Sequence, residues 1–114
     1  MRFGRGQGDQ QIGGEMPKLL RVFRATVRRG KVEEFTSFFV EVAVPLVKSF
    51  EGMESVVIGL PEEGTEREFM MTTTWKDVAA LKKFAGKNWR NPMIHPKEKS
   101  LLKELAVHHY WLAE

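Results

Sequence analysis

The sequence predicts an α+β fold in which a four-stranded antiparallel sheet carries two helices on one face. Four segments rich in β-branched and aromatic residues are separated by turn signals, which is typical of strands. Two segments with apolar side chains at helical spacing lie between the first and second strands and between the third and fourth. The resulting order, βαββαβ, is that of the ferredoxin-like arrangement, and 114 residues suit one such domain.

The first strand is predicted at residues 19–28, and Gly30 ends it. Apolar residues occur at both parities, so we expect a strand that is covered on both faces. The two faces are Leu20, Val22 and Thr26 on one side and Phe23, Ala25 and Val27 on the other. A buried arginine needs an anion or a hydrogen-bond acceptor, so Arg21 or Arg24 is expected to mark a pocket or an interface.

The first helix is predicted at residues 31–50, which repeat apolar side chains at helical spacing and place most charges on the other side. Pro45 lies inside this segment and has no backbone N–H. We therefore expect a kink or break near residues 41–43. Gly52 is predicted to end the helix.

A second strand is predicted at residues 53–60, followed by a polar turn at 61–66 and a third strand at 67–75. Asp77 is placed to cap the next helix and Gly86 to end it.

The remaining chain is predicted as an irregular loop, KNWRNPMIHP, and a short helix from Pro96 to about Lys103. The last strand is expected at residues 104–113.

This arrangement leaves one face of the sheet without helices. Phe23, Met70 and Val107 are expected on that face, where they would form an exposed apolar patch. A homodimer that packs sheet against sheet about a two-fold axis would cover the patch.

Composition and charge exclude several classes of protein. There is no cysteine, and the net charge of +3 comes from interleaved basic and acidic residues, which is typical of a solvated surface and argues against nucleic-acid binding. No apolar run is long enough to span a membrane, and the N-terminus lacks a secretory signal, so a cytoplasmic location is expected. Residues 1–16 contain five glycines and are expected to form a flexible tail before a domain at 17–114.

Four pieces of the sequence resemble, in their order and spacing, the antibiotic biosynthesis monooxygenase-like branch of the dimeric α+β barrel proteins. They are the first strand running into RRGKVEEF, then SFEGMESVVIGLP, FMMTTTWKDVAALKKFAGKNW and IHPKEKSLLKELAVHHYWL. The resemblance covers about residues 18–112 and implies a dimeric α+β barrel with a pocket in each subunit between the sheet and its helices. Some members of that family oxidise phenols or quinols with dioxygen and without a metal or flavin, and others degrade haem.

The haem-degrading members use an asparagine on the first strand, a tryptophan at the end of the third strand and a histidine in the second helix. The corresponding positions here hold Phe23, Trp75 and Ala85. Two of the three roles have no suitable side chain, so the resemblance argues against haem degradation, and we expect no cofactor.

Several side chains are candidates for binding a substrate in the implied pocket. By the resemblance, Trp75 and Met71 point toward the helices, and Trp75 would either stack on a flat ligand or pack in the core. Trp89 would either line the pocket mouth or dock its loop. Arg24 and Tyr110 complete the substrate-binding candidates.

His95 and His109 are the candidate catalytic bases, because imidazole accepts protons near neutral pH. His108 and His109 are adjacent on a strand and point to opposite faces, so one chain cannot use both at one metal ion. Each histidine also has a purely structural interpretation. No set of His, Asp and Glu has the spacing of a zinc or iron site, so we expect no metal.

Three candidate functions remain for this sequence. The first is a cofactor-independent monooxygenase, in which a small phenol or quinol loses a proton to His109 or His95 and passes electrons to dioxygen. The second is a non-enzymatic homodimer that holds a small aromatic or apolar ligand, with haem binding as a third. An oxygenase of this kind needs a base within about 3 Å of the substrate hydroxyl, so the direction of the histidines separates the first two.

Overall fold

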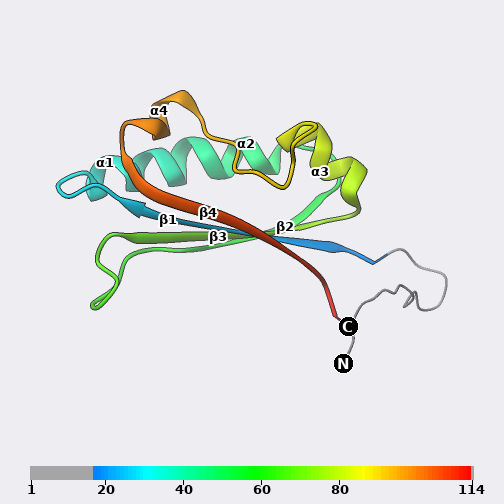
Figure 1. Cartoon of the computed structure of the whole chain (residues 1–114), viewed down its shortest axis with the longest axis horizontal. Helices are drawn as coiled ribbons and strands as arrows, with labels where there is room; N and C mark the ends of the chain where they lie inside the picture. Colours follow the sequence, from blue (N-terminus) through cyan, green and yellow to red (C-terminus); the bar gives the residue numbers. More distant parts are fainter. Residues whose placement is uncertain (1–16, 114) are drawn as a thin grey trace.

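The computed structural model describes residues 17–113, and the expected tail at residues 1–16 lies outside this range. The strands form one antiparallel sheet in the order β2-β3-β1-β4. All helices lie over one face of the sheet (Figure 1). The predicted ferredoxin-like α+β fold is therefore confirmed.

The four strands lie close to their predicted positions. Their bounds are β1 Leu19–Val27, β2 Met53–Gly59, β3 Glu68–Trp75 and β4 Leu102–Trp111. The start of β4 differs, because the helix before it, α4, spans only Pro96–Lys99 and does not continue to Lys103. Leu101 and Leu102 leave the helix to bury their side chains in the core, where they are 2% and 6% exposed.

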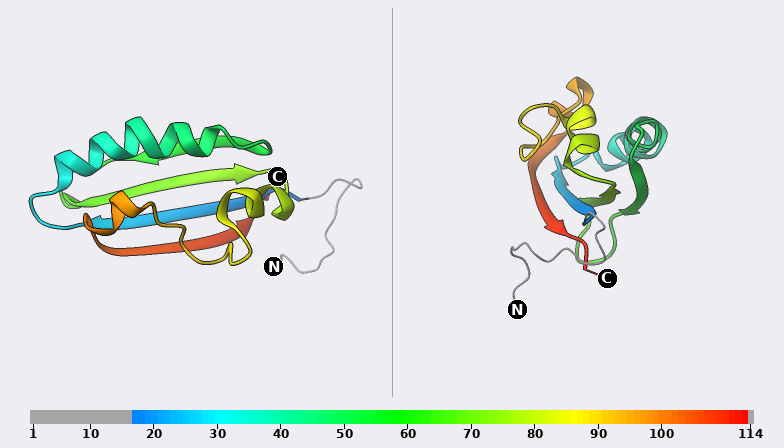
Figure 2. Two further views of the ribbon diagram at one scale, coloured as in Figure 1. Left: turned by 90° about the horizontal axis from the view of Figure 1, so that it is seen from above. Right: turned by 90° about the vertical axis from the view of Figure 1, so that its right-hand side faces the viewer.

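The first helix is irregular where Pro45 predicts a kink or break near residues 41–43, but it continues without a break. It consists of α1 Val32–Phe38, a π-helical segment η1 Phe39–Ala43 and α2 Val44–Lys48. Pro45 cannot donate a hydrogen bond to the preceding turn, and the wider π turn lies directly before it. Figure 2 shows that the three parts still run as one rod along the sheet.

The second helix, α3 Val78–Ala85, begins and ends as predicted. The Asp77 side chain accepts a hydrogen bond of 2.8 Å from the backbone N–H of Ala80. Gly86 ends the helix with a φ of 87°, a conformation that glycine adopts without steric cost.

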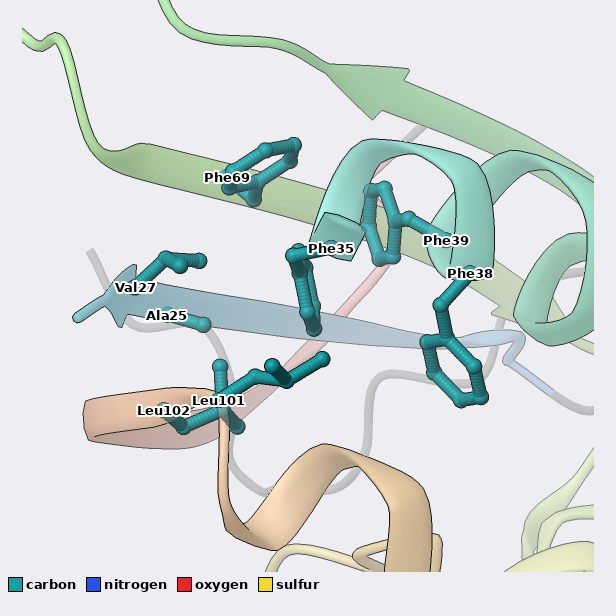
Figure 3. Packing of buried hydrophobic residues seen from close by; sticks show 8 residues of the cluster. All are labelled: Ala25, Val27, Phe35, Phe38, Phe39, Phe69, Leu101 and Leu102. Carbon is teal, nitrogen blue, oxygen red and sulfur yellow. The ribbon is translucent and has the colours of Figure 1, made fainter. Parts of the chain in front are cut away.

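Two clusters of buried side chains fill the space between sheet and helices. The first is rich in phenylalanine, and Figure 3 shows Phe35 and Phe39 pointing from the helix toward the sheet and Phe69. The ring centroids of Phe35 and Phe69 lie 4.7 Å apart in an edge-on arrangement. The second cluster lies at the other end of the sheet and includes Trp75 and Trp89.

The expectation that Phe23 and Val107 lie on the uncovered face is wrong. Phe23 contacts the helix, with its ring centroid 6.3 Å from that of Phe39. Val107 pairs with Phe23 in the sheet register and shares its face, whereas Met70 pairs with Arg24 and lies on the uncovered face as expected. The physical reason is the alternation of side chains along a strand. Phe23 and Ala25 are two residues apart, so both point to the same face of the sheet.

No described helix covers the other face of the sheet (Figure 2). Leu20 and Val22 on this face are half-buried, and Val57 and Tyr110 are 59% and 53% exposed. Within residues 17–113, β1 is thus covered on one face and not on two. Pairing of two copies over the bare face stays a prediction. Among the described helices, none has the length and apolar character needed to cross a membrane.

Candidate functional site

A small cavity lies over the sheet, between the first helix on one side and the segment from α3 to α4 on the other. Its floor is formed by side chains of β1 and β3, namely Arg21, Phe23, Met71 and Thr73. The wall from α3 and the following loop consists of Phe84, Met93, His95 and Glu98. Leu46 and Met93 are 38% and 40% exposed, which places the mouth between α2 and the loop.

The cavity has a volume of about 70 Å³. Sites for drug-sized ligands are several times larger, at roughly 300–1,000 Å³. An engineered cavity that holds benzene measures about 150 Å³, so even a single ring enters here only if side chains at the mouth move aside.

A row of three polar side chains crosses the floor and its edge. Arg21 on β1 pairs in the sheet register with Thr73 on β3 and with His109 on β4, so all three point to the helical face. Nη1 of Arg21 donates a hydrogen bond of 2.7 Å to the carbonyl oxygen of Trp89 and lies 3.0 Å from Nε2 of His109. The Thr73 hydroxyl accepts a bond of 2.8 Å from Nε1 of Trp75.

Arg21 is buried without an anionic partner among the described residues. It is 5% exposed, and the ion pairs within residues 17–113 join Lys18 to Glu54 and Lys31 to Glu34. Burial lowers the pKa of Arg21 to about 10, so the guanidinium is still charged at neutral pH. A positive charge therefore lies on the floor of the cavity with only neutral groups bound to it.

His109 is held neutral beside this charge. A guanidinium can only donate, so Nε2 of His109 accepts from Arg21 and the imidazole proton is assigned to Nδ1. Burial, and then the positive charges of Arg21, Arg90 and His108, lower the pKa of His109 to about 4. The ring packs edge-on against Trp89 at 4.9 Å and is not part of the cavity lining.

His95 lines the cavity, and it also begins α4. Its Nδ1 accepts a hydrogen bond of 3.1 Å from the N–H of Lys97, and its own N–H donates over 2.8 Å to Oε1 of Glu98. With Nδ1 occupied as an acceptor, a neutral His95 carries its proton on Nε2. Its ring contacts Phe38 at a centroid distance of 5.2 Å.

Trp75 does not line the cavity, and of its two expected roles the structure agrees with packing in the core. Its side chain is fully buried, and Phe84 stacks on it with ring centroids 5.5 Å apart. Of these two rings, Phe84 borders the cavity, and the guanidinium of Arg21 lies 5.9 Å from its centroid. Trp75 thus supports the aromatic wall from behind.

Trp89 docks its loop onto the second core cluster and is 7% exposed. It serves the site through its backbone, because its carbonyl oxygen holds Arg21. Arg90 covers the outer side of the indole, with Cζ 4.2 Å from the ring centroid.

Arg24 and Tyr110 are not brought to this cavity. Both have the opposite parity to Arg21, and both side chains are exposed on the uncovered face. Arg24 borders a separate, broad hollow of about 540 Å³ beside the turn between β2 and β3. Placing them in one pocket with Met71 was therefore wrong for the single chain, since alternate residues of a strand point to opposite faces.

Three residues of the site were not predicted from the sequence to line it. The sequence indicates that Arg21 or Arg24 marks a pocket or an interface, and Arg24 is the one predicted to bind substrate, whereas the structure places Arg21 on the core side with Ala25 and Val27. Phe84 was assigned only to the packing face of its helix, and Glu98 carried no signal. Among residues 17–113 there is no cluster of three or more His, Asp or Glu side chains that could hold a metal ion.

Comparison with known families gives one match. The sequence profile described as antibiotic biosynthesis monooxygenase matches residues 19–88, which include β1 to α3 and therefore most of the cavity floor. None of the curated protein sequences matches the chain.

Solved structures with the same fold come from several organisms. A protein of Shewanella oneidensis is 16% identical with a TM-score of 0.70, over 84% of this chain and 91% of that one. A conserved protein of Methanosarcina mazei is 22% identical with a TM-score of 0.66, over 83% and 92%. A candidate antibiotic biosynthesis monooxygenase of Bordetella bronchiseptica is 15% identical with a TM-score of 0.64, over 87% and 100%. At these identities the similarity shows the fold alone.

Proposed function

Because the chain belongs to the antibiotic biosynthesis monooxygenase family, we propose that it binds a small aromatic molecule over its sheet and oxidises it with dioxygen. The observation that carries this proposal is the cavity between sheet and helices. Its walls are mainly phenyl and aliphatic groups, together with His95 and Glu98, and its floor holds one buried cation, Arg21. Ligand sites are commonly apolar with a few polar groups that set the orientation.

The reaction would be the cofactor-independent oxygenation of a phenol or quinol. The substrate itself supplies the electrons, one oxygen atom enters the ring to give a quinone, and the other leaves as water. The protein contributes a dry site and a fixed orientation of the ring, with Phe84 on one side and Met71 below it.

Neither candidate histidine has a free lone pair with which to accept the substrate proton. The lone pair of His95 Nδ1 accepts the Lys97 N–H, and that of His109 Nε2 accepts from Arg21. His95 would therefore present an N–H donor to a ligand, and it could take a proton only if its capping bond opened. The substrate would thus have to arrive ionised or lose its proton to water.

A non-enzymatic binding module is the second candidate, and the occupied histidine lone pairs favour it. The same cavity would then hold a small aromatic metabolite without converting it. In either case we propose a homodimer in the cytoplasm that pairs through the uncovered sheet face, where Val57 and Tyr110 are exposed. That pairing leaves the cavity on the opposite face open to ligand.

Oxygen-electrode measurements with a panel of phenols and quinols test the oxygenase. We expect uptake that depends on the protein and that persists with chelator present. His95→Ala, checked for folding by circular dichroism, tests the remaining imidazole. An inert wild type with every substrate contradicts the oxygenase and favours the binding module. The absence of a Soret band after haem addition would exclude haem binding.

A further inference from the structure

The burial of Arg21 is not explained by its protein partners. A charged group removed from water is stabilised by an opposite charge or by a full set of hydrogen bonds. Arg21 is 5% exposed and contacts a backbone carbonyl and an imidazole, both neutral. Within residues 17–113, no carboxylate forms an ion pair with it.

The unused donors of Arg21 lie together. A guanidinium has five N–H groups, and the two on Nη1 account for the bonds to Trp89 and His109. The donors on Nη2 and Nε have no acceptor among the described residues. These donors form one edge of the planar group, and such an edge matches the two oxygens of a carboxylate or a single phenolate oxygen.

The charged and titratable groups around the cavity favour an anion beside this edge. His109 is neutral and does not compensate the charge of Arg21, and Arg90 adds a second positive charge nearby. His95 lines the same cavity with an N–H donor at Nε2. Glu98, on the wall that α4 contributes, is the acidic group of the lining and opposes an anion when it is ionised, and burial raises its pKa.

The rest of the lining suits an aromatic ring. Phe84 and Phe38 border the cavity from opposite walls, and Met71 forms part of the floor. The volume of about 70 Å³ is smaller than a ring needs, so a ring enters only when exposed side chains of the lining, Leu46 and Met93, move aside.

We infer that the cavity selects a small aromatic oxyanion, a phenolate or an aryl carboxylate, and that Arg21 binds the charged oxygen. The inference rests on the proposed function, since it takes the cavity as the ligand site, and it adds the class of ligand. It also removes the need for a histidine base, because a cation in a dry site favours the ionised form of a bound phenol. A phenolate is the more electron-rich form, as oxygenation requires.

The test uses para-nitrophenol, whose phenolate absorbs visible light and whose phenol does not. We titrate the probe with pH in the presence and absence of saturating full-length protein. The bound probe should ionise at least about one pH unit below the free probe. A shift of that size corresponds to about tenfold tighter binding of the phenolate than of the phenol. Benzoate and benzamide, compared by calorimetry, test the carboxylate against its neutral analogue, and the affinities of benzoate and of the phenolate show which oxyanion is preferred.

Two variants and a neutral probe locate the effect at Arg21. Arg21→Met should abolish the shift in ionisation, and Arg21→Lys should keep part of it. Para-nitroanisole has no ionisable group and should bind wild type and Arg21→Met alike, which shows that the cavity is intact in the variant.

The outcomes separate this inference from the proposed oxygenation. If wild type binds the neutral phenol as tightly as the phenolate, or binds neither para-nitrophenol nor benzoate, the inference is overturned without reference to any variant. If the ionisation shift is present but no oxygen is consumed, the inference stands and the oxygenase proposal fails.

Discussion

Arg21 and His109 face each other across the β1–β4 ladder, with 3.0 Å between Nη1 of the guanidinium and Nε2 of the imidazole. One group is always a cation, and the other becomes one when it is protonated. Protonation would remove the acceptor that Arg21 uses and place two positive charges in contact. The neutral imidazole is therefore part of what holds the buried arginine in position.

His109 should make the protein less stable in mild acid. Its pKa is about 4 in the folded state, below the usual 6.5, so the unfolded chain binds more protons between these values. The stabilisation is complete above about pH 6.5 and falls as the pH drops toward 4. Urea unfolding of wild type and His109→Gln across this range measures it, since glutamine keeps an acceptor and does not titrate. Equal slopes for the two proteins would contradict the assignment.

Removing Arg21 should raise the pKa of His109, but not to its usual value. Burial is the largest cause of the depression, and the charge of Arg21 comes second. In Arg21→Met the imidazole should therefore titrate between about 4 and 6.5 in an NMR pH titration. An unchanged midpoint would show that the two groups are not in contact. Arg24→Met is the matched control, because Arg24 lies on the opposite face.

Local patterns were sufficient for the elements but not for the site. The strands, the Asp77 cap and the disturbance before Pro45 each depend on a few neighbouring residues, and they were predicted correctly. The end of α4 depends on a distant core that buries Leu101 and Leu102, which no local signal contains.

The choice between Arg21 and Arg24 shows the same limit. Parity tells which residues of β1 share a face, but not which face the helices cover. That second fact follows from the packing of Phe23 against Phe39, which are brought together only by the tertiary fold. Likewise, Phe84 and not Trp75 borders the cavity because the stacking order of two aromatic rings depends on where α3 sits over the sheet.

Glu98→Gln should stabilise the protein at neutral pH. Burial raises the pKa of Glu98, so the folded state holds its proton more tightly than the unfolded chain. Stability from this group is present below its usual pKa of 4.5 and is lost as the pH rises through the raised folded value. Glutamine stays neutral, and its Oε1 can still accept the His95 N–H, as Glu98 does over 2.8 Å.

Thermal unfolding at several pH values tests this expectation. The melting temperature of Glu98→Gln should exceed that of wild type at pH 7, and the difference should shrink in acid. Glu98→Ala removes the cap as well and should cost about 1 kcal/mol relative to Glu98→Gln. A glutamine variant that is less stable than wild type at pH 7 would show that the ionised carboxylate is favourable at the start of α4.

Gly52→Ala should destabilise the fold more than the same change at Gly64. Both glycines have positive φ, 92° and 95°, so alanine costs roughly 1–2 kcal/mol at each from backbone strain. At Gly64 the added methyl group meets open space, whereas at Gly52 it runs into the side chain of Ala80 on α3. The extra cost of overpacking at Gly52 is about 1–3 kcal/mol.

Urea denaturation of the two variants isolates this contact, because the strain term is common to both. If the loss in unfolding free energy is the same, the close approach of Gly52 to Ala80 does not constrain α3. A displaced α3 would also change the cavity, because α3 carries Phe84, whose ring lines it. Gly52→Ala should therefore weaken the binding of para-nitroanisole, a probe that depends on the aromatic wall and not on charge, while Gly64→Ala leaves it unchanged.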